Sequence, residues 1–121
     1  MDKEVVKYTY MMGDNKVTDI IENSNGVIDF INYSDDILDT AFGIKKSPVS
    51  VEDLEKFFKR RCFPETRGNV KRILKTLGVG FYSPRLIVQK THGVMFDDIY
   101  WIRFEGEDNL KYSEVRESLG L

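Results

Sequence analysis

The stretch that decides the fold is Val5–Glu22, VVKYTYMMGDNKVTDIIE, near the start of the 121-residue chain. Aromatic and branched residues alternate with polar residues on both sides of a short turn at Gly13-Asp14-Asn15. A period of two is typical of β-strands, and a turn rich in Gly, Asp and Asn between two such runs indicates a hairpin. We therefore predict two antiparallel strands, Val5–Met12 and Lys16–Glu22.

A third strand is expected directly after this hairpin. The cluster Asn23-Ser24-Asn25-Gly26 has the composition of a turn, and the β-forming run Val27–Ile31 follows it. Residues 1–33 are therefore predicted to form a small β part. The next residues, 34–49, contain several Asp, Gly and Pro residues and are predicted to be a connection with at most one helical turn.

Residues 50–92 have the signals of a helical part. Ser50 has the character of an N-cap, with Asp53 three residues later as in a capping box, and predicts a helix over 51–61. Thr66 is expected to cap a second helix that ends at Gly78. This second helix has apolar residues at helical spacing, namely Val70, Ile73, Leu74 and Leu77. A third helix is expected to begin at Ser83-Pro84 and to end at about Thr91.

A late strand is predicted at 99–104, where the run is Ile-Tyr-Trp-Ile-Arg-Phe, and Tyr112–Leu119 fits a short terminal helix. Trp101 is expected to be buried among the apolar residues of this strand. The predicted fold is thus a single α+β domain spanning 1–121. A small N-terminal antiparallel β-hairpin or sheet packs on about three helices, and one late buried strand completes it.

Composition indicates a folded protein of the cytoplasm. Apolar residues make up 41% of the chain and charged residues 31%, which is typical of globular proteins. The first ten residues lack the apolar run of a signal peptide, and no apolar stretch is long enough to cross a bilayer. Cys62 is the only cysteine, which fits a reducing compartment. We expect a cytoplasmic protein that does not act in a membrane.

Charge is unevenly distributed along the chain, although the formal net charge is only −2. Residues 1–43 have a net charge of −6, residues 44–75 of +6 and residues 76–121 of −2. The basic part contains the candidate binding residues Arg60, Arg61, Arg67, Lys71, Arg72 and Lys75. These side chains could balance the acidic hairpin within the fold, contact another protein, or bind nucleic acid through the basic helical face 59–75.

The other residues with chemical potential favour structural roles. His92 is the only histidine and has no cysteine partners for a structural zinc site. Cys62 has nearby arginines that would lower its pKa, but it lacks the partners that nucleophilic catalysis needs. Asp97 and Asp98 are adjacent and would point to opposite faces of an extended segment. We therefore expect no catalytic residues, no metal and no cofactor, and no enzyme activity.

Two stretches carry a resemblance when they are taken together. Arg61-Cys62-Phe63-Pro64-Glu65-Thr66-Arg67 opens the predicted second helix, with Asn69 just inside it. The second stretch is Thr91–Arg103, which ends in Asp98-Ile99-Tyr100-Trp101-Ile102-Arg103. This pairing resembles the N-terminal accessory region of HipA-like protein kinase homologues of clostridia, their phages and integrative elements. The likeness spans most of the chain, and its most specific part is Trp101 with Asp98.

The kinase activity of HipA-like proteins resides in a downstream lobe, and none of its catalytic residues can be carried over to this chain. The resemblance therefore implies a non-catalytic protein-interaction or regulatory module of a bacterial or mobile-element system. Its partner would be another protein whose identity the sequence does not give. The alternatives are a nucleic-acid-binding protein and a small phage or mobile-element inhibitor of a host nucleic-acid machine.

Overall fold

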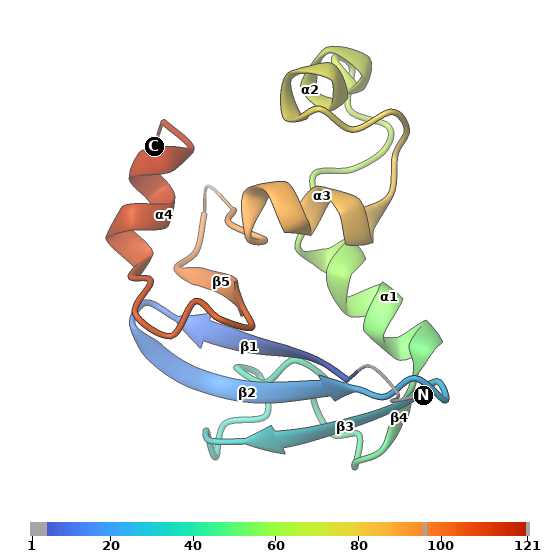
Figure 1. Cartoon of the computed structure of the whole chain (residues 1–121), viewed down its shortest axis with the longest axis vertical. Coiled ribbons are helices and arrows are strands. Elements are labelled where there is room, and N and C mark those ends of the chain that lie inside the picture. The colour runs from blue at the N-terminus through green and yellow to red at the C-terminus, as the bar shows by residue number, and fades with distance from the viewer. Residues whose placement is uncertain (1–4, 96, 121) are drawn as a thin grey trace.

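The computed structural model describes residues 5–95 and 97–120, and Figure 1 shows an antiparallel sheet with helices on it. The sheet has five strands in the order β4-β3-β2-β1-β5, and every neighbouring pair is antiparallel. The strands are β1 (Val6–Met12), β2 (Asn15–Glu22), β3 (Val27–Asn32), β4 (Val49–Ser50) and β5 (Tyr100–Phe104). The helices are α1 (Val51–Arg60), α2 (Val70–Leu77), α3 (Pro84–Thr91) and α4 (Tyr112–Ser118). The predicted α+β class is confirmed.

The predicted hairpin forms the centre of the sheet as β1 and β2. Met12 pairs with Asn15, so the turn consists of Gly13 and Asp14 alone, and Asn15 belongs to the strand. Gly13 has φ 59°, a left-handed conformation that glycine adopts at low cost. The register shifts between Tyr10 and Met11, which is a β-bulge.

The late strand β5 joins the sheet beside β1, so the first and last strands of the chain are neighbours. Tyr10 pairs with Ile102, and Met11 pairs with Trp101. At the other edge, residues 34–48 form turns and bends, and the chain then adds the two-residue strand β4 beside β3. The sequence analysis did not predict β4, because two residues are too few to show a period.

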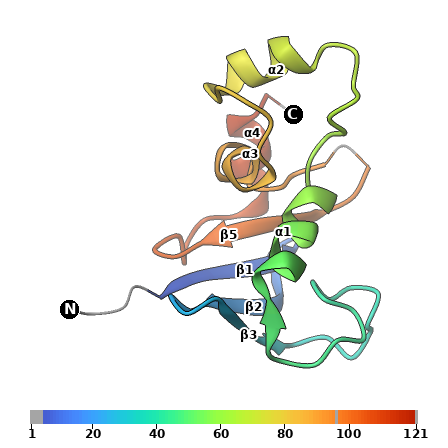
Figure 2. The same ribbon diagram turned by 90° about the vertical axis from the view of Figure 1, so that its right-hand side faces the viewer.

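The helices begin and end largely where the sequence predicts. Ser50 and Asp53 form the predicted capping box of α1, and Ser83 caps α3 through the amide of Leu86. The expected cap at Thr66 is wrong, since α2 begins at Val70 with Asn69 at the N-cap position. Figure 2 shows the excursion of the chain between α1 and α2.

The two faces of the sheet bury separate apolar clusters. The larger cluster contains Tyr8, Tyr10, Ile20 and Ile28 from the sheet, and it packs against α1 and α3. The aromatic rings of Tyr10 and Phe57 meet edge to face, with their centroids 4.9 Å apart. The smaller cluster lies under α4.

Trp101 is the centre of this smaller cluster and is fully buried with Met11 and Val115. Its indole Nε1 donates a hydrogen bond of 2.6 Å to the carbonyl oxygen of Gly13 in the hairpin turn. The amide of Tyr112 at the start of α4 donates to Asp14 in the same turn. The turn thus holds both the tryptophan and the terminal helix, which confirms the predicted burial of Trp101.

We predict that Trp101→Ala lowers the free energy of unfolding by about 3–5 kcal/mol, because it leaves a large cavity in a closed cluster. Urea denaturation followed by circular dichroism measures the change. The control is Ile99→Ala, whose side chain is half exposed, and it should change stability by about 0.5 kcal/mol or less. A red-shifted and readily quenched tryptophan emission from the native protein would contradict the burial.

Candidate binding surface on helix α2

One of the six candidate binding residues, Arg61, lies inside the protein, where it joins the end of α1 to β5. Its side chain is 7% exposed. Nη1 and Nη2 donate to the two carboxylate oxygens of Asp98 at 2.9 and 2.8 Å. Nε donates to the carbonyl of Gly93, and Nη2 also donates to the carbonyl of Tyr100. We call this set of contacts the Arg61 clasp; it uses the guanidinium internally, so Arg61 is not part of an exposed basic face.

The surroundings of the Arg61 clasp keep both of its charged groups ionised. Burial opposes the charged form of Arg61, but the hydrogen bonds and charge of Asp98 outweigh it and raise the pKa of the guanidinium. Burial also favours the neutral acid of Asp98, but hydrogen bonds from Arg61 and the Tyr100 amide lower the pKa of its carboxyl below 3.8. The adjacent Asp97 is exposed and acts on Arg61 only through its charge, without a hydrogen bond, so the two predicted carboxylates do not converge.

We predict that Asp98→Asn destabilises the protein by about 3 kcal/mol at neutral pH, because it leaves a buried arginine without its counter-charge. Asp97→Asn makes the same change of charge at an exposed neighbour and should have little effect. When folding lowers the pKa of a carboxyl, that group stabilises the protein at pH values above its pKa in the unfolded state. The stabilisation is lost as the pH falls through the lower pKa of the folded state.

The acid limb of the stability curve gives a second readout of the same variant. The wild-type protein should lose the contribution of Asp98 below about pH 4, and Asp98→Asn should flatten this part of the curve. Thermal unfolding between pH 2 and pH 8 measures both effects. Equal stability of the two variants at pH 7 would contradict a structural role for the Arg61 clasp.

Arg60 is also turned towards its own chain. Its Nη2 donates to the carbonyl of Ala41, and its guanidinium carbon lies 5.6 Å from the centre of the Phe57 ring. These contacts hold the connection 34–48 against the end of α1. Part of the basic run therefore serves the fold.

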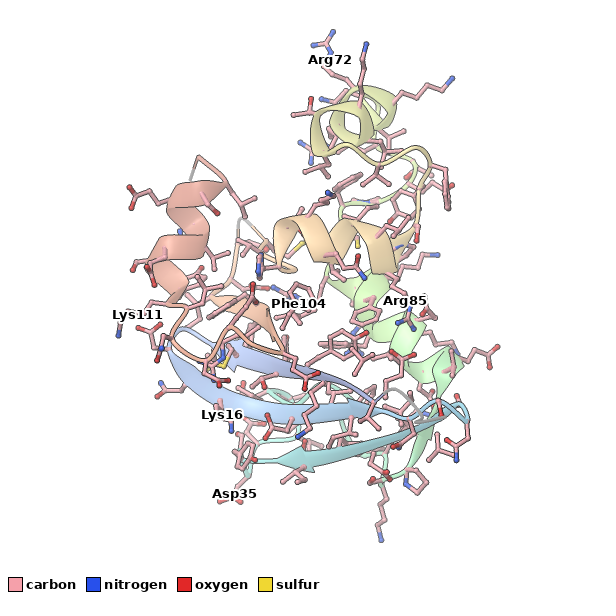
Figure 3. All side chains as sticks on the ribbon, viewed as in Figure 1. Lys16, Asp35, Arg72, Arg85, Phe104 and Lys111 are labelled. Atoms are coloured by element: carbon pink, nitrogen blue, oxygen red, sulfur yellow. The ribbon has the colours of Figure 1, made fainter. Side chains whose placement is uncertain are left out.

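The other four candidates lie at the surface on and just before α2, and they are Arg67, Lys71, Arg72 and Lys75. None of the four forms an ion pair with a carboxylate in the part of the chain that the structure describes. Figure 3 shows Arg72 at one extreme of the longest axis of the molecule, away from the sheet. We call these four residues the α2 basic surface.

The local sequence explains why these cations point outwards. Leu74 is buried on the inner side of α2, and Val70 and Leu77 pack partly against the main core. Residues three or four apart share one side of a helix, so Lys71 and Lys75 occupy the opposite side. Gly78 ends the helix in the left-handed conformation, with φ 77°. The first turn of α2 carries no acidic residue, so the cations there remain uncompensated.

Cys62, immediately after the buried arginine, is a packed residue. It is 7% exposed, and its Sγ lies 3.2 Å from the carbonyl oxygen of Phe58. Burial raises the pKa of the thiol to about 12, against the smaller opposing effect of the Arg61 charge. The sequence suggested that nearby arginines would lower this pKa, but loss of hydration has the larger effect.

We predict that the Cys62 thiol of the folded protein reacts very slowly with a disulfide reagent such as dithionitrobenzoate at pH 8. The thiolate is the reacting form, and it is scarcely populated at that pH when the pKa is about 12. The same protein in denaturant should release one equivalent of thionitrobenzoate per chain within seconds. Rapid stoichiometric reaction without denaturant would show that the thiol is accessible and ionised.

His92 ends α3 in the left-handed conformation, with φ 55°. Its backbone oxygen accepts a hydrogen bond from the Ile102 amide, and its ring Nε2 lies 3.1 Å from a carboxylate oxygen of Glu107. These contacts support the structural role expected for it. Among the described residues, no three or more His, Cys, Asp or Glu side chains cluster in a way that could hold a metal ion.

The sequence analysis missed an ion cluster and an exposed apolar loop. Arg85 on α3 pairs with Glu22 on β2 at 2.8 Å and with Glu55 on α1 at 2.6 Å, tying three elements together. Leu38 and Ile44, in the connection before β4, are 87% and 80% exposed. A signal for the loop exists in the sequence, since aliphatic residues there are surrounded by Asp and Lys.

No family model, curated protein or solved structure matches the chain. None of the helices in the described ranges is both long and apolar enough to span a membrane.

Proposed function

We propose that this chain is a non-catalytic protein-interaction or regulatory module whose α2 basic surface binds an acidic surface of another protein. The observation that carries the proposal is the exposure of four cations on and just before one short helix, without ion-pair partners among the described residues. Uncompensated charges on one side of a small domain steer an oppositely charged partner and accelerate association.

Nucleic acid is the second candidate, because Gly68–Arg72 line a shallow depression at the start of α2, and this lining includes the cations Lys71 and Arg72. The number of available cations argues against it as the first choice. Arg61 is buried, and Arg60 binds a carbonyl of its own chain. If the remaining four each met a phosphate, affinity for duplex DNA would fall roughly 100-fold between 50 and 200 mM salt. The formal net charge of −2 adds repulsion of a polyanion.

The positions of the motif residues also fit this proposal. Arg61, Asp98 and Trp101 carry the resemblance to the accessory region of HipA-like kinase homologues, and all three have contacts within the fold. The shared pattern then specifies a scaffold rather than a chemical site. Such a scaffold would present a binding surface to a partner in a cytoplasmic bacterial or mobile-element system. The inhibitor of a host nucleic-acid machine is one special case of this proposal, in which the acidic partner is that machine.

We predict that Lys71→Glu/Arg72→Glu weakens partner binding at least tenfold without changing the fold. The full chain first captures proteins from native extract, and one captured protein is then purified. Its affinity for wild type and variant is measured by surface plasmon resonance at 50 and 200 mM salt. The loss should appear mainly as slower association, because long-range attraction is removed.

The matched control is Lys56→Glu/Lys90→Glu, which makes the same change of charge at two exposed residues on α1 and α3. Its affinity should stay within about twofold of wild type. Equal loss in both variants would show that only net charge matters and would refute the α2 basic surface. Submicromolar binding of duplex DNA at 150 mM salt, abolished in the α2 variant, would establish nucleic-acid binding instead.

A further inference from the structure

The segment that carries the α2 basic surface is joined to the core by few buried side chains. Residues 64–82 leave the main body after α1, form α2 and return to α3, and we call them the α2 arm. Figures 1 and 2 both show α2 beyond α3, on the side away from the sheet. Within the arm, all of which the structure describes, only Leu74 and Val79 are buried, whereas Ile87 and Val88 anchor α3 with no exposure. Local opening costs least where few apolar side chains are buried.

The polar contacts of the α2 arm stay within it. Among the described residues, 64–81 form no ion pair with the rest of the protein and no hydrogen bond to it. The base of the arm is closed by Tyr82, whose hydroxyl donates to the carbonyl of Phe63 at 2.7 Å. The two rings also meet edge to face, with their centroids 5.9 Å apart. We call this contact the Tyr82 latch, and it joins the two ends of the arm.

The local sequence gives α2 little stability of its own. Asn69 at the N-cap makes no side-chain hydrogen bond to the helix, and the first turn contains Lys71 and Arg72 but no acidic residue. The helix dipole disfavours cations at this end, and Lys71 and Lys75, four residues apart, repel each other. A helix of eight residues is marginal without packing. The charges that form the α2 basic surface therefore weaken the helix that presents them.

We propose that the α2 arm opens as a unit while the sheet, α1 and α3 stay folded, and that binding of an acidic partner closes it. The proposal rests on the function proposed above and adds the regulation of the same surface. Negative charge on the partner relieves the repulsion among the cations, and a ligand that binds only the closed form shifts the equilibrium towards that form. The Tyr82 latch sets how often the arm is open when no partner is bound.

Hydrogen–deuterium exchange of the full chain, followed by mass spectrometry, measures the opening without a partner. After correction for intrinsic rates, we expect the amides of 73–79 to exchange at least tenfold faster than those of 87–92, although both sets lie in or directly after a helix. Tyr82→Phe removes only the hydroxyl of the latch and should accelerate exchange in the arm about fivefold, as for the loss of one hydrogen bond. Lys71→Glu removes the repulsion from Lys75 and places an acid in the first turn, so it should slow this exchange.

The matched control is Tyr112→Phe, which removes a hydroxyl on α4 that donates to the carbonyl of Asp98, outside the arm. It should lower the melting temperature by an amount similar to Tyr82→Phe. It should change exchange in the arm by less than twofold, because α4 stays packed when the arm opens. Equal acceleration of the arm in both variants would show that the arm exchanges only when the whole chain unfolds. That result, or exchange in the arm as slow as in α3, would overturn the proposal and leave the α2 basic surface standing.

Poly-L-aspartate, used as the probe for an acidic partner surface, tests the closure at 50 mM salt. At ten times its dissociation constant, measured by calorimetry, it should slow exchange of 73–79 about tenfold, because only the closed arm binds it. It should have no effect on exchange in Lys71→Glu/Arg72→Glu. Binding to the wild-type protein without slower exchange would show a rigid surface and would overturn the closure alone. Failure of the polymer to bind the wild-type protein would instead refute the α2 basic surface, whether or not the arm opens.

Discussion

The interaction on which the rest of the structure depends is the buried guanidinium of Arg61. It connects the C-terminal end of α1 with Gly93, Asp98 and Tyr100, which are more than 30 residues later in the chain. The guanidinium carbon also lies 5.8 Å from the centres of the Tyr10 and Tyr100 rings. Burying an arginine is costly, and here Nε, Nη1 and Nη2 each donate a hydrogen bond to an oxygen of the fold.

The Arg61 clasp also constrains the backbone around it. Gly93 has φ 65°, and a Cβ there would lie 3.1 Å from Ile102 and 3.2 Å from Arg61, so a larger residue would push the arginine away. Asp98 of the clasp, together with His92 and Glu107, also protects the outer edge of β5. The amide of Tyr100 donates to Asp98, that of Ile102 to the carbonyl of His92, and that of Phe104 to Glu107. An edge satisfied in this way is a poor template for another strand.

Much of the fold could be predicted from the sequence because its signals are local. The hairpin follows from period-two alternation around Gly13-Asp14, and α1 follows from the capping box of Ser50 and Asp53. The start of α2 could not be predicted as well, since Thr66 and Asn69 are both acceptable cap residues, and the observed N-cap Asn69 makes no side-chain capping hydrogen bond. Less of the candidate site was predictable. Six basic residues look alike in the sequence, but only three of them, Lys71, Arg72 and Lys75, lie on the exposed side of α2, with Arg67 just before it.

The sequence by itself determined the α+β class, the order of the main elements, the burial of Trp101 and the uneven charge, because each depends on neighbouring residues or on composition. Only the tertiary structure decided which charges stay free. Arg61 is buried in an ion pair with a carboxylate 37 residues later in the chain, and Arg85 forms an ion pair with Glu22, 63 residues earlier. In the connection before β4, contacts with Thr18 and Arg60 likewise hold Ala41 inside, while Leu38 and Ile44 on either side of it stay exposed. Long-range pairing leaves no period in the sequence, and for this reason the surface available for binding emerges only after the chain has folded.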